Sequence, residues 1–120
     1  MLKADLHIHT TASDGLLSPE KVVRWASAKR LTAIGITDHD TVKGISPAMK
    51  ASSKYGVEIV PGIELSTIFE EEEIHVLGYF IDYNSQWLAD TLKKIQNSRY
   101  ERAGKIVGKL NDLGIDITLE

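Results

Sequence analysis

Hydrophobic and polar positions follow two different periods in the first half of the chain. Short apolar runs alternate with stretches in which apolar residues recur at helical spacing. The apolar runs lie at about 3–9, 32–37 and 57–61, and the helical stretches at about 19–30 and 44–55. Ser18 and Pro19 suit the cap and first residue of the first helix, and Gly56 suits the end of the second. Strand–helix–strand units imply parallel pairing, so the pattern predicts an α/β fold.

The second half of the chain has a different pattern. Strand-like runs at 65–69 and 74–80 flank the four glutamates at 70–73, which predicts a β-hairpin with the glutamates at a solvated tip. From residue 85 to about 114 the apolar positions return to helical spacing and predict one long or broken helix. Residues 115–118 are a candidate for a further strand.

Composition limits the class of protein. With 120 residues, of which 42% are hydrophobic, the chain is long enough for one core. No apolar run approaches the roughly 18 residues of a membrane span, and no signal-like leader is present, so we expect a cytoplasmic protein without membrane contact. The chain has no cysteine, which excludes thiolate metal ligands and disulfides. A metal ion would have to be held by histidine and carboxylate.

The histidines carry the candidate chemistry. His7 and His9 alternate along a predicted strand, so both imidazoles would lie on one face and point to one place. A surface pair of polar residues is the plain alternative. His39 follows the next strand directly and His75 lies in the alternating run of the hairpin, so all four histidines occur in or just after strand-like segments. This arrangement favours a metal site.

Four motifs in order resemble the polymerase and histidinol phosphatase (PHP) family of metal-dependent phosphoesterases. They are Asp5-Leu6-His7-Ile8-His9-Thr10 with Ser13-Asp14-Gly15, Gly35-Ile36-Thr37-Asp38-His39-Asp40-Thr41, Pro61-Gly62-Ile63-Glu64, and His75-Val76-Leu77-Gly78-Tyr79. The resemblance covers residues 1–82. It is most specific to the subgroup that dephosphorylates nucleotide 3′,5′-bisphosphates or trims short 5′-phosphorylated oligonucleotides.

The resemblance implies a distorted (β/α)7 barrel with divalent ions at its strand ends. Residues 1–84 would be the N-terminal portion of the barrel, and residues 85–120 the start of an incomplete helical insertion. Two or three ions of manganese, iron or zinc are implied. Carried over by motif, the metal ligands would be His7, His9, Asp14, His39, Glu64 (the bridging carboxylate) and His75. Asp5, Asp38 and Asp40 would orient imidazoles or cap the following turns.

The implied activity is hydrolysis of phosphate esters of nucleotides or short oligonucleotides by a metal-activated water. The family continues with a later His and an Asp-x-His motif, whereas this sequence has no histidine after His75. We therefore expect the chain to be a piece of a longer enzyme and to be inactive by itself. The alternatives are a non-catalytic metal-binding or regulatory module, a histidinol-phosphatase-like enzyme for small molecules, and a fragment that self-associates through uncovered strand edges.

Two arginines of the long helix are candidates for substrate binding. Arg99 falls on the apolar stripe between Ile95 and Ala103, and Arg102 lies one turn before Ile106. Both guanidinium groups would then approach a buried or cleft-facing side and could grip phosphate oxygens, which resembles the subgroup's use of arginines in its insertion. The alternative is that their aliphatic stems pack while their charged groups stay in water.

Overall fold

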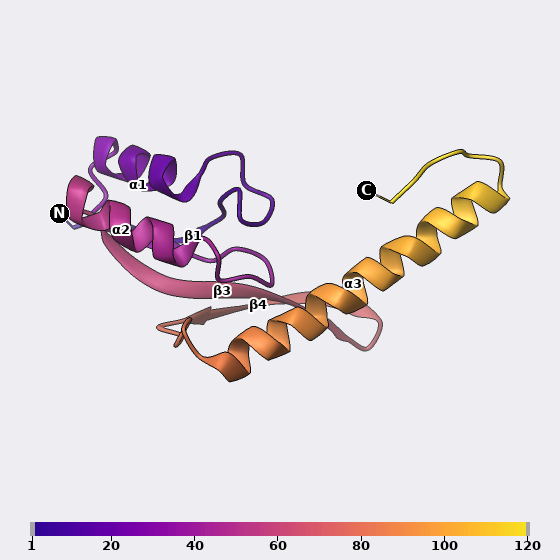
Figure 1. Cartoon of the computed structure of the whole chain (residues 1–120). Coiled ribbons are helices and arrows are strands. Elements are labelled where there is room, and N and C mark those ends of the chain that lie inside the picture. Colours follow the sequence, from indigo (N-terminus) through magenta and orange to yellow (C-terminus); the bar gives the residue numbers. More distant parts are fainter. Residues whose placement is uncertain (1, 120) are drawn as a thin grey trace. The chain divides into compact units, whose positions relative to one another are not determined.

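A computed structural model describes residues 2–119 of the chain. Contacts between Cα atoms divide the chain into two units, Met1–Ser85 and Gln86–Glu120. Met1 and Glu120, the outermost residues of the two predicted domain ranges, lie outside the described residues. The first unit contains a sheet and two helices, and the second unit contains one long helix (Figure 1).

The first unit has a four-stranded sheet in the order β1-β2-β3-β4. Its elements are β1 (Ala4–Ile8), α1 (Pro19–Ala28), β2 (Ala33–Ile36), α2 (Ile45–Tyr55), β3 (Glu58–Phe69) and β4 (Glu72–Tyr79). β1 pairs with β2 and β2 with β3 in parallel, whereas β3 and β4 are antiparallel. The predicted mixed α/β fold and the parallel pairing of its first three strands are confirmed.

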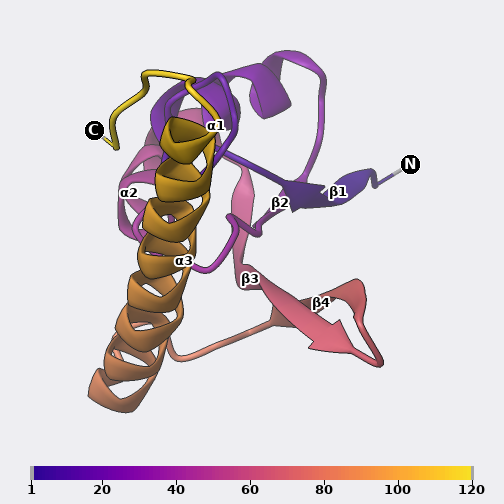
Figure 2. The ribbon, with the colours of Figure 1, turned by 90° about the vertical axis from the view of Figure 1, so that its right-hand side faces the viewer.

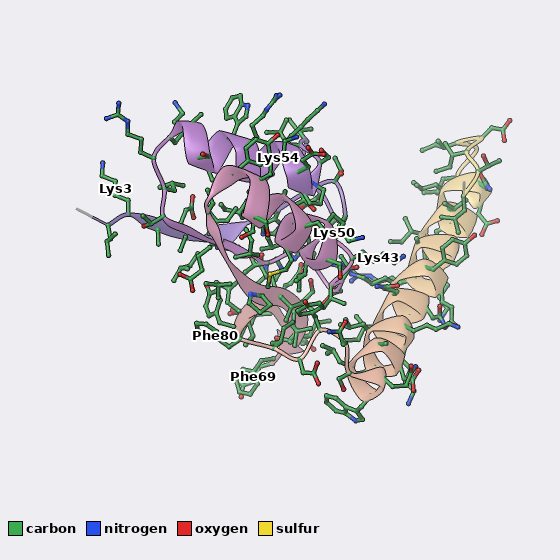
Figure 3. The ribbon with its side chains drawn as sticks, turned by 60° about the vertical axis from the view of Figure 1, so that its left-hand side comes forward. Lys3, Lys43, Lys50, Lys54, Phe69 and Phe80 are labelled. Atoms are coloured by element: carbon green, nitrogen blue, oxygen red, sulfur yellow. The ribbon has the colours of Figure 1, made fainter. Side chains whose placement is uncertain are left out.

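The core lies between the two helices and the sheet. α1 and α2 lie side by side, as Figure 1 shows, and one cluster of buried side chains joins both helices to β2 and β3. Val23 of α1, Ile34 of β2 and Ala48 of α2 are fully buried within it. On the outside, Lys54 of α2 lies 3.6 Å from Glu20 of α1, an exposed ion pair (Figure 3). Burial of apolar area holds the helices to the sheet, and the exposed ion pair between the two helices adds little.

Local sequence explains where the helices begin and end. Ser18 caps α1 by accepting a hydrogen bond from the backbone N–H of Lys21 at 3.4 Å, and Pro19 is its first residue, as predicted. α1 ends at Ala28, two residues before the predicted end, because Arg30 takes a left-handed φ of 60°. α2 ends as predicted just before Gly56, whose φ of 66° suits a residue without a Cβ atom.

β3 differs from the sequence prediction, which placed a strand at 57–61 and a separate hairpin arm at 65–69. The structure has one continuous strand of 12 residues, which curves strongly in Figure 2. Its first part pairs with β2 and its later part, from Gly62 to Phe69, pairs with β4. Glu70 and Glu71 form the turn of the hairpin with positive φ angles, and the other two glutamates begin β4. Phe69, beside this turn, is exposed (Figure 3).

The second unit is helical. α3 (Gln86–Asp112) is one continuous helix of 27 residues, and Gly114 follows it with a φ of 84°. Residues 115–118 form no strand in the part of the chain that the structure describes, so the prediction of a further strand there is wrong. None of the helices formed by residues 2–119 is both long and apolar enough to cross a membrane. The cytoplasmic location stays a prediction.

Candidate metal centre

Six predicted site residues lie together, four of them at or after the ends of β1 and β2 and two within the β3–β4 hairpin. His7 is in β1, His9 follows it, Asp14 is in the next loop, His39 follows β2, Glu64 is in β3 and His75 is in β4. They form three overlapping groups in which one ligand atom from each residue lies within 4.8 Å of the others. The groups are His7–His9–Glu64, His9–Asp14–His39 and His39–Glu64–His75. Elements far apart in sequence thus supply one set of nitrogen and oxygen atoms.

The first group has the dimensions of a chelating site. Oε2 of Glu64 lies 2.8 Å from Nε2 of His7 and 2.8 Å from Nε2 of His9, and the two nitrogens are 3.1 Å apart. Two metal–ligand bonds of about 2.1 Å that meet at roughly 90° hold their ligand atoms about 3 Å apart. The three atoms therefore fit a divalent cation that takes nitrogen and oxygen ligands.

His9 faces carboxylates with both of its ring nitrogens. Nδ1 lies 2.7 Å from Oδ1 of Asp14, while Nε2 faces Glu64 at 2.8 Å. A neutral imidazole carries one proton, so it can satisfy only one of these oxygens. A proton on Nδ1 leaves the Nε2 lone pair directed at a carboxylate, an arrangement that requires either a second proton or a cation between them. The donor set thus suits a metal ion.

The remaining distances connect the three groups. Nε2 of His39 lies 3.7 Å from Oδ2 of Asp14 and 3.6 Å from Oε2 of Glu64. Nδ1 of His75 lies 3.0 Å from the other oxygen of Glu64, Oε1. Glu64 therefore turns one oxygen toward His7, His9 and His39 and the other toward His75. This is the geometry of a carboxylate that could bridge two cations.

The charges within the cluster shift three pKa values. Burial acts to raise the pKa of Glu64, but its hydrogen bond with His7 and the charges of His39 and His7 together outweigh this and hold the pKa below its ordinary value. The hydrogen bond with His9 lowers the pKa of Asp14. The hydrogen bond with Glu73, followed by the contact with Glu64, raises the pKa of His75 despite some desolvation. Both carboxylates are thus ionised at neutral pH, as metal ligands must be.

A tight turn brings Asp14 back toward His9. The carbonyl of Thr10 accepts hydrogen bonds from the backbone N–H groups of Ser13 at 3.1 Å and Gly15 at 2.9 Å. A Cβ atom at Gly15 would lie 2.5 Å from the carbonyl oxygen of His9, which is closer than real contacts allow. Glycine is therefore required here by close approach of the backbone, and this packing places the adjacent Asp14 next to the His9 ring.

The three other motif aspartates bond mainly to backbone and hydroxyl groups. Oδ1 of Asp5 accepts from the backbone N–H of His7 at 3.2 Å, and Oδ1 of Asp40 accepts from that of Ser66 at 3.0 Å. Asp38 accepts from Thr10 and Ser13 and, within residues 2–119, from no imidazole. Nδ1 of His39 is buried and has no hydrogen-bond partner in this part of the chain. Asp38 therefore bonds to the turn after β1, and neither the predicted capping of its following turn nor the orientation of an imidazole is seen among residues 2–119.

The two predicted arginines belong to the long helix. Arg99 and Arg102 are on α3, in the second unit, and both side chains are exposed. The predicted approach to a buried side is not seen, because the apolar stripe that carries them is open at Ile106, which is 49% exposed. Their binding of phosphate stays a prediction.

Sequence reasoning gave no role to two buried threonines beside the cluster. Thr10 and Thr37 are fully buried. Oγ1 of Thr37 accepts from the backbone N–H of Ile8 at 3.1 Å, and Oγ1 of Thr10 and Oγ of Ser13 donate to Asp38. The signal available in the sequence was a threonine at the end of each of the first two strand-like runs, next to His9 in one case and next to Asp38 in the other.

Comparison with known proteins agrees with this geometry. Residues 5–113 match the sequence model of the PHP domain. The chain belongs to the PHP domain family. It is 41% identical over 118 residues to the 5′-3′ exoribonuclease Rnm of Escherichia coli, a match that covers 97% of this chain and 40% of the relative. It is 35% identical over 115 residues to the 3′,5′-nucleoside bisphosphate phosphatase of Chromobacterium violaceum, covering 96% of the chain and 40% of that protein.

Solved structures of PHP-like proteins have the same fold. One is an amidohydrolase from Chromobacterium violaceum with bound sulfate and no metal, which matches with a TM-score of 0.85 and 34% identity over 96% of this chain and 40% of that chain. Another, described as a metal-dependent phosphoesterase from Bifidobacterium adolescentis, matches with a TM-score of 0.83 and 28% identity over 92% and 39%. This PHP chain thus spans about 40% of the length of the curated relatives it matches.

Proposed function

We propose that this PHP chain supplies metal ligands of a phosphoesterase that hydrolyses phosphate esters of nucleotides or short oligonucleotides. The ligands are His7, His9, Asp14, His39, Glu64 and His75, and together they hold two or three divalent ions of manganese, iron or zinc. The observation that carries the proposal is the position of the Glu64 carboxylate, with one oxygen 2.8 Å from Nε2 of both His7 and His9 and the other 3.0 Å from Nδ1 of His75.

Each residue has a definable task. Asp14 takes the Nδ1 proton of His9 in a hydrogen bond and thereby directs the Nε2 lone pair into the cluster. Glu64 is buried and ionised, so it contributes negative charge where the imidazoles contribute neutral nitrogens. The bound ions would lower the pKa of a water molecule and neutralise charge on the phosphoryl oxygens. None of these residues needs to act as a nucleophile.

The substrate class rests on the relatives and on the second unit. The relatives' names specify an exoribonuclease and a nucleoside bisphosphate phosphatase, and one neighbour binds sulfate, which has the shape and charge type of phosphate. We assign Arg99 and Arg102 to substrate phosphate, because a planar guanidinium binds such oxygens in pairs. Residues 1–84 would then be part of a (β/α)7 barrel and residues 85–120 the start of its helical insertion.

One observation favours a second candidate, a metal-binding module without turnover. All six candidate ligands lie within the first 75 residues of a chain that spans about 40% of its relatives' length. Such a chain could bind ions without a complete catalytic set. Phosphate release distinguishes the three candidates: a nucleotide enzyme, a small-molecule phosphatase and an inactive module. It is measured with a 3′,5′-nucleoside bisphosphate, a short 5′-phosphorylated oligoribonucleotide and histidinol phosphate.

Metal binding is tested on the chain itself by calorimetric titration of the metal-free protein with Mn²⁺ and Zn²⁺, together with elemental analysis. We expect Glu64→Ala to abolish at least one binding step, since that carboxylate takes part in two of the three groups. Glu71→Ala, in the exposed hairpin turn, is the matched control and should bind as the wild type does. If Glu64→Ala bound ions with unchanged stoichiometry and affinity, the proposed function would be wrong.

A further inference from the structure

Asp38 is a buried carboxylate that joins the end of β2 to the loop after β1. Its exposure is only 1%. Oδ1 accepts hydrogen bonds from the backbone N–H of Thr10 at 2.7 Å and from Oγ of Ser13 at 2.7 Å, and Oδ2 accepts from Oγ1 of Thr10 at 2.8 Å. All three partners belong to the same turn. One side chain therefore fixes the position of this turn relative to β2.

The residues that form these bonds are the direct sequence neighbours of the residues in one candidate metal group. Thr10 follows His9, Ser13 precedes Asp14, and Asp38 precedes His39. The three residues of the hydrogen-bonded cluster are thus the sequence neighbours of His9, Asp14 and His39, whose ligand atoms lie within 4.8 Å of one another. Neither His7 nor His75 is adjacent in sequence to a member of this cluster.

The space around Asp38 leaves its carboxylate little freedom. A Cβ atom at Gly44 would lie 2.4 Å from Oδ2 of Asp38 and 2.9 Å from Oγ1 of Thr10. The backbone at the start of α2 therefore packs directly against this pair. The hydroxyl of Thr10 also accepts from the backbone N–H of Ala12 at 3.1 Å, which continues the network into the turn. A carboxylate that is packed and hydrogen-bonded on several sides cannot move easily, so it also fixes the positions of the groups bonded to it.

On the basis of the metal-binding function proposed above, we propose that Asp38 is a positioning residue for the metal position of Asp14 and His39, beside which His9 is held by its hydrogen bond with Asp14. It ties the loop that carries His9 and Asp14 to the strand end that carries His39, and so sets the separation of these ligands. It acts through Thr10 and Ser13 and touches no metal ion. The position formed by His7, His9 and Glu64 depends on it less, because β1 and β3 fix two of those ligands.

The test uses the full chain and a double-mutant cycle read by Co²⁺ absorption and calorimetric Mn²⁺ titration. Asp14→Ala first identifies the binding step that contains Asp14. We expect Asp38→Ala to weaken this same step by about 10- to 100-fold, the usual effect of losing a group that orients a ligand. The variant with both substitutions should then lose little more than Asp14→Ala alone, whereas Asp38→Ala and Glu64→Ala should have separate effects.

Two further variants separate geometry from charge and from general stability. Asp38→Asn keeps an oxygen for the Thr10 N–H and the Ser13 hydroxyl, and its amide can donate to Oγ1 of Thr10, so we expect it to restore most of the affinity. Ser52→Ala removes a partly buried hydrogen bond to the carbonyl of Val57 away from the cluster and controls for lost stability. If Asp38→Ala fails to fold, Thr10→Val removes the hydrogen bond from Oγ1 of Thr10 to Asp38, together with that from the Ala12 N–H, and should weaken the same step several-fold.

Several outcomes would overturn the proposal. It is wrong if Asp38→Ala weakens all steps equally and in proportion to its loss of unfolding free energy, as a purely structural residue would. Full additivity with Asp14→Ala, or an Asp38→Asn variant as weak as Asp38→Ala, would also exclude it. If the wild type binds no divalent ion, the proposed function fails separately. The positioning role is then decided in the metal-free protein by the ¹⁵N resonances of the His9 ring, which must move in Asp38→Ala and stay in Ser52→Ala.

Discussion

His39 and Glu64 are joined through their backbones as well as through their side chains. The two residues form an isolated parallel bridge, in which the N–H of Asp40 donates to the carbonyl of Glu64 at 3.0 Å and the N–H of Glu64 donates to the carbonyl of Asp38 at 3.2 Å. Their side chains then approach to 3.6 Å. The segment after β2 thus behaves as a short extension of the sheet. It holds a histidine against the buried carboxylate, although Nδ1 of His39 has no hydrogen-bond partner among residues 2–119.

Gly15→Ala should disturb both folding and metal binding. The added Cβ atom would lie within 2.7 Å of three backbone atoms of His9 and Thr10, so the turn must move and carry Asp14 with it. We expect a loss of about 1–3 kcal/mol in the free energy of unfolding, measured by urea denaturation, and weaker Mn²⁺ binding. Gly108→Ala, in α3 with open space around it, is the control and should stabilise the helix by about 0.5–1 kcal/mol. Equal effects of the two substitutions would contradict the argument from close packing.

The stability of the metal-free chain should depend on pH in a defined way. The lowered pKa values of Asp14 and Glu64 give stability that is complete above their ordinary values of 3.8 and 4.5 and is lost as the pH falls. The raised pKa of His75 gives stability that is complete below 6.5 and is lost as the pH rises. We therefore expect the greatest unfolding free energy between pH 4.5 and 6.5 in the presence of a chelator.

His75→Gln tests the alkaline side of this dependence. The variant should lose the decrease in unfolding free energy above pH 6.5 and keep the decrease in acid, because its carboxylates are unchanged. Glu73→Gln should weaken the same alkaline decrease, since the hydrogen bond with Glu73 is the main cause of the raised pKa. Added Mn²⁺ should reverse the trend, because metal binding requires deprotonated ligands. A decrease above pH 6.5 that persists in His75→Gln would mean that another group titrates there.

The chain alone should have little phosphoesterase activity. Its six candidate ligands all precede residue 76, and the later His and Asp-x-His motifs of the resembling family are not in this sequence. An incomplete ligand set activates water poorly. Release of inorganic phosphate from a 3′,5′-nucleoside bisphosphate in the presence of Mn²⁺ measures this. Turnover at rates typical of enzymes, from about 1 s⁻¹ upward, would show that the six residues suffice or that self-association completes the site.

Arg99 should contribute to phosphate binding. A hydrogen bond between a guanidinium and a phosphate stabilises a complex by about 1.5–3 kcal/mol, so Arg99→Ala should weaken binding of a 3′,5′-nucleoside bisphosphate to the Mn²⁺-loaded chain by roughly 10- to 150-fold. Arg99→Lys should recover part of this, because an ammonium lacks the planar fork. Lys94→Ala on the same helix is the control for charge alone. If Arg99→Ala and Arg102→Ala both bound the bisphosphate with unchanged affinity, the assignment of α3 to phosphate binding would be wrong.

The sequence was sufficient to predict most of the first unit because strand periodicity and parallel pairing place the ends of β1 and β2 together. That is why His7, His9 and His39 could be grouped before the structure was known. β3 could not be predicted as one strand, since Pro61-Gly62 reads as a break. Pro61 instead stands opposite Ile36, the last residue of β2, where the strand changes partners and its missing N–H costs little. The bonds of Asp38 depend on how the Thr10–Gly15 turn folds back, which no local pattern encodes.

The edge position of β1 has a consequence for the order in which the ligands capture an ion. Among the described strands β1 has one neighbour, and the side chain of His7 is half exposed, whereas Glu64 lies on a strand paired with two neighbours and is buried. Amide hydrogens of β1 should therefore exchange faster than those around Glu64 in the metal-free chain, and an incoming ion should slow them most. His7 would then be the last ligand to close on the ion and the first to release it, so the fraying of a strand end would set the residence time of the metal.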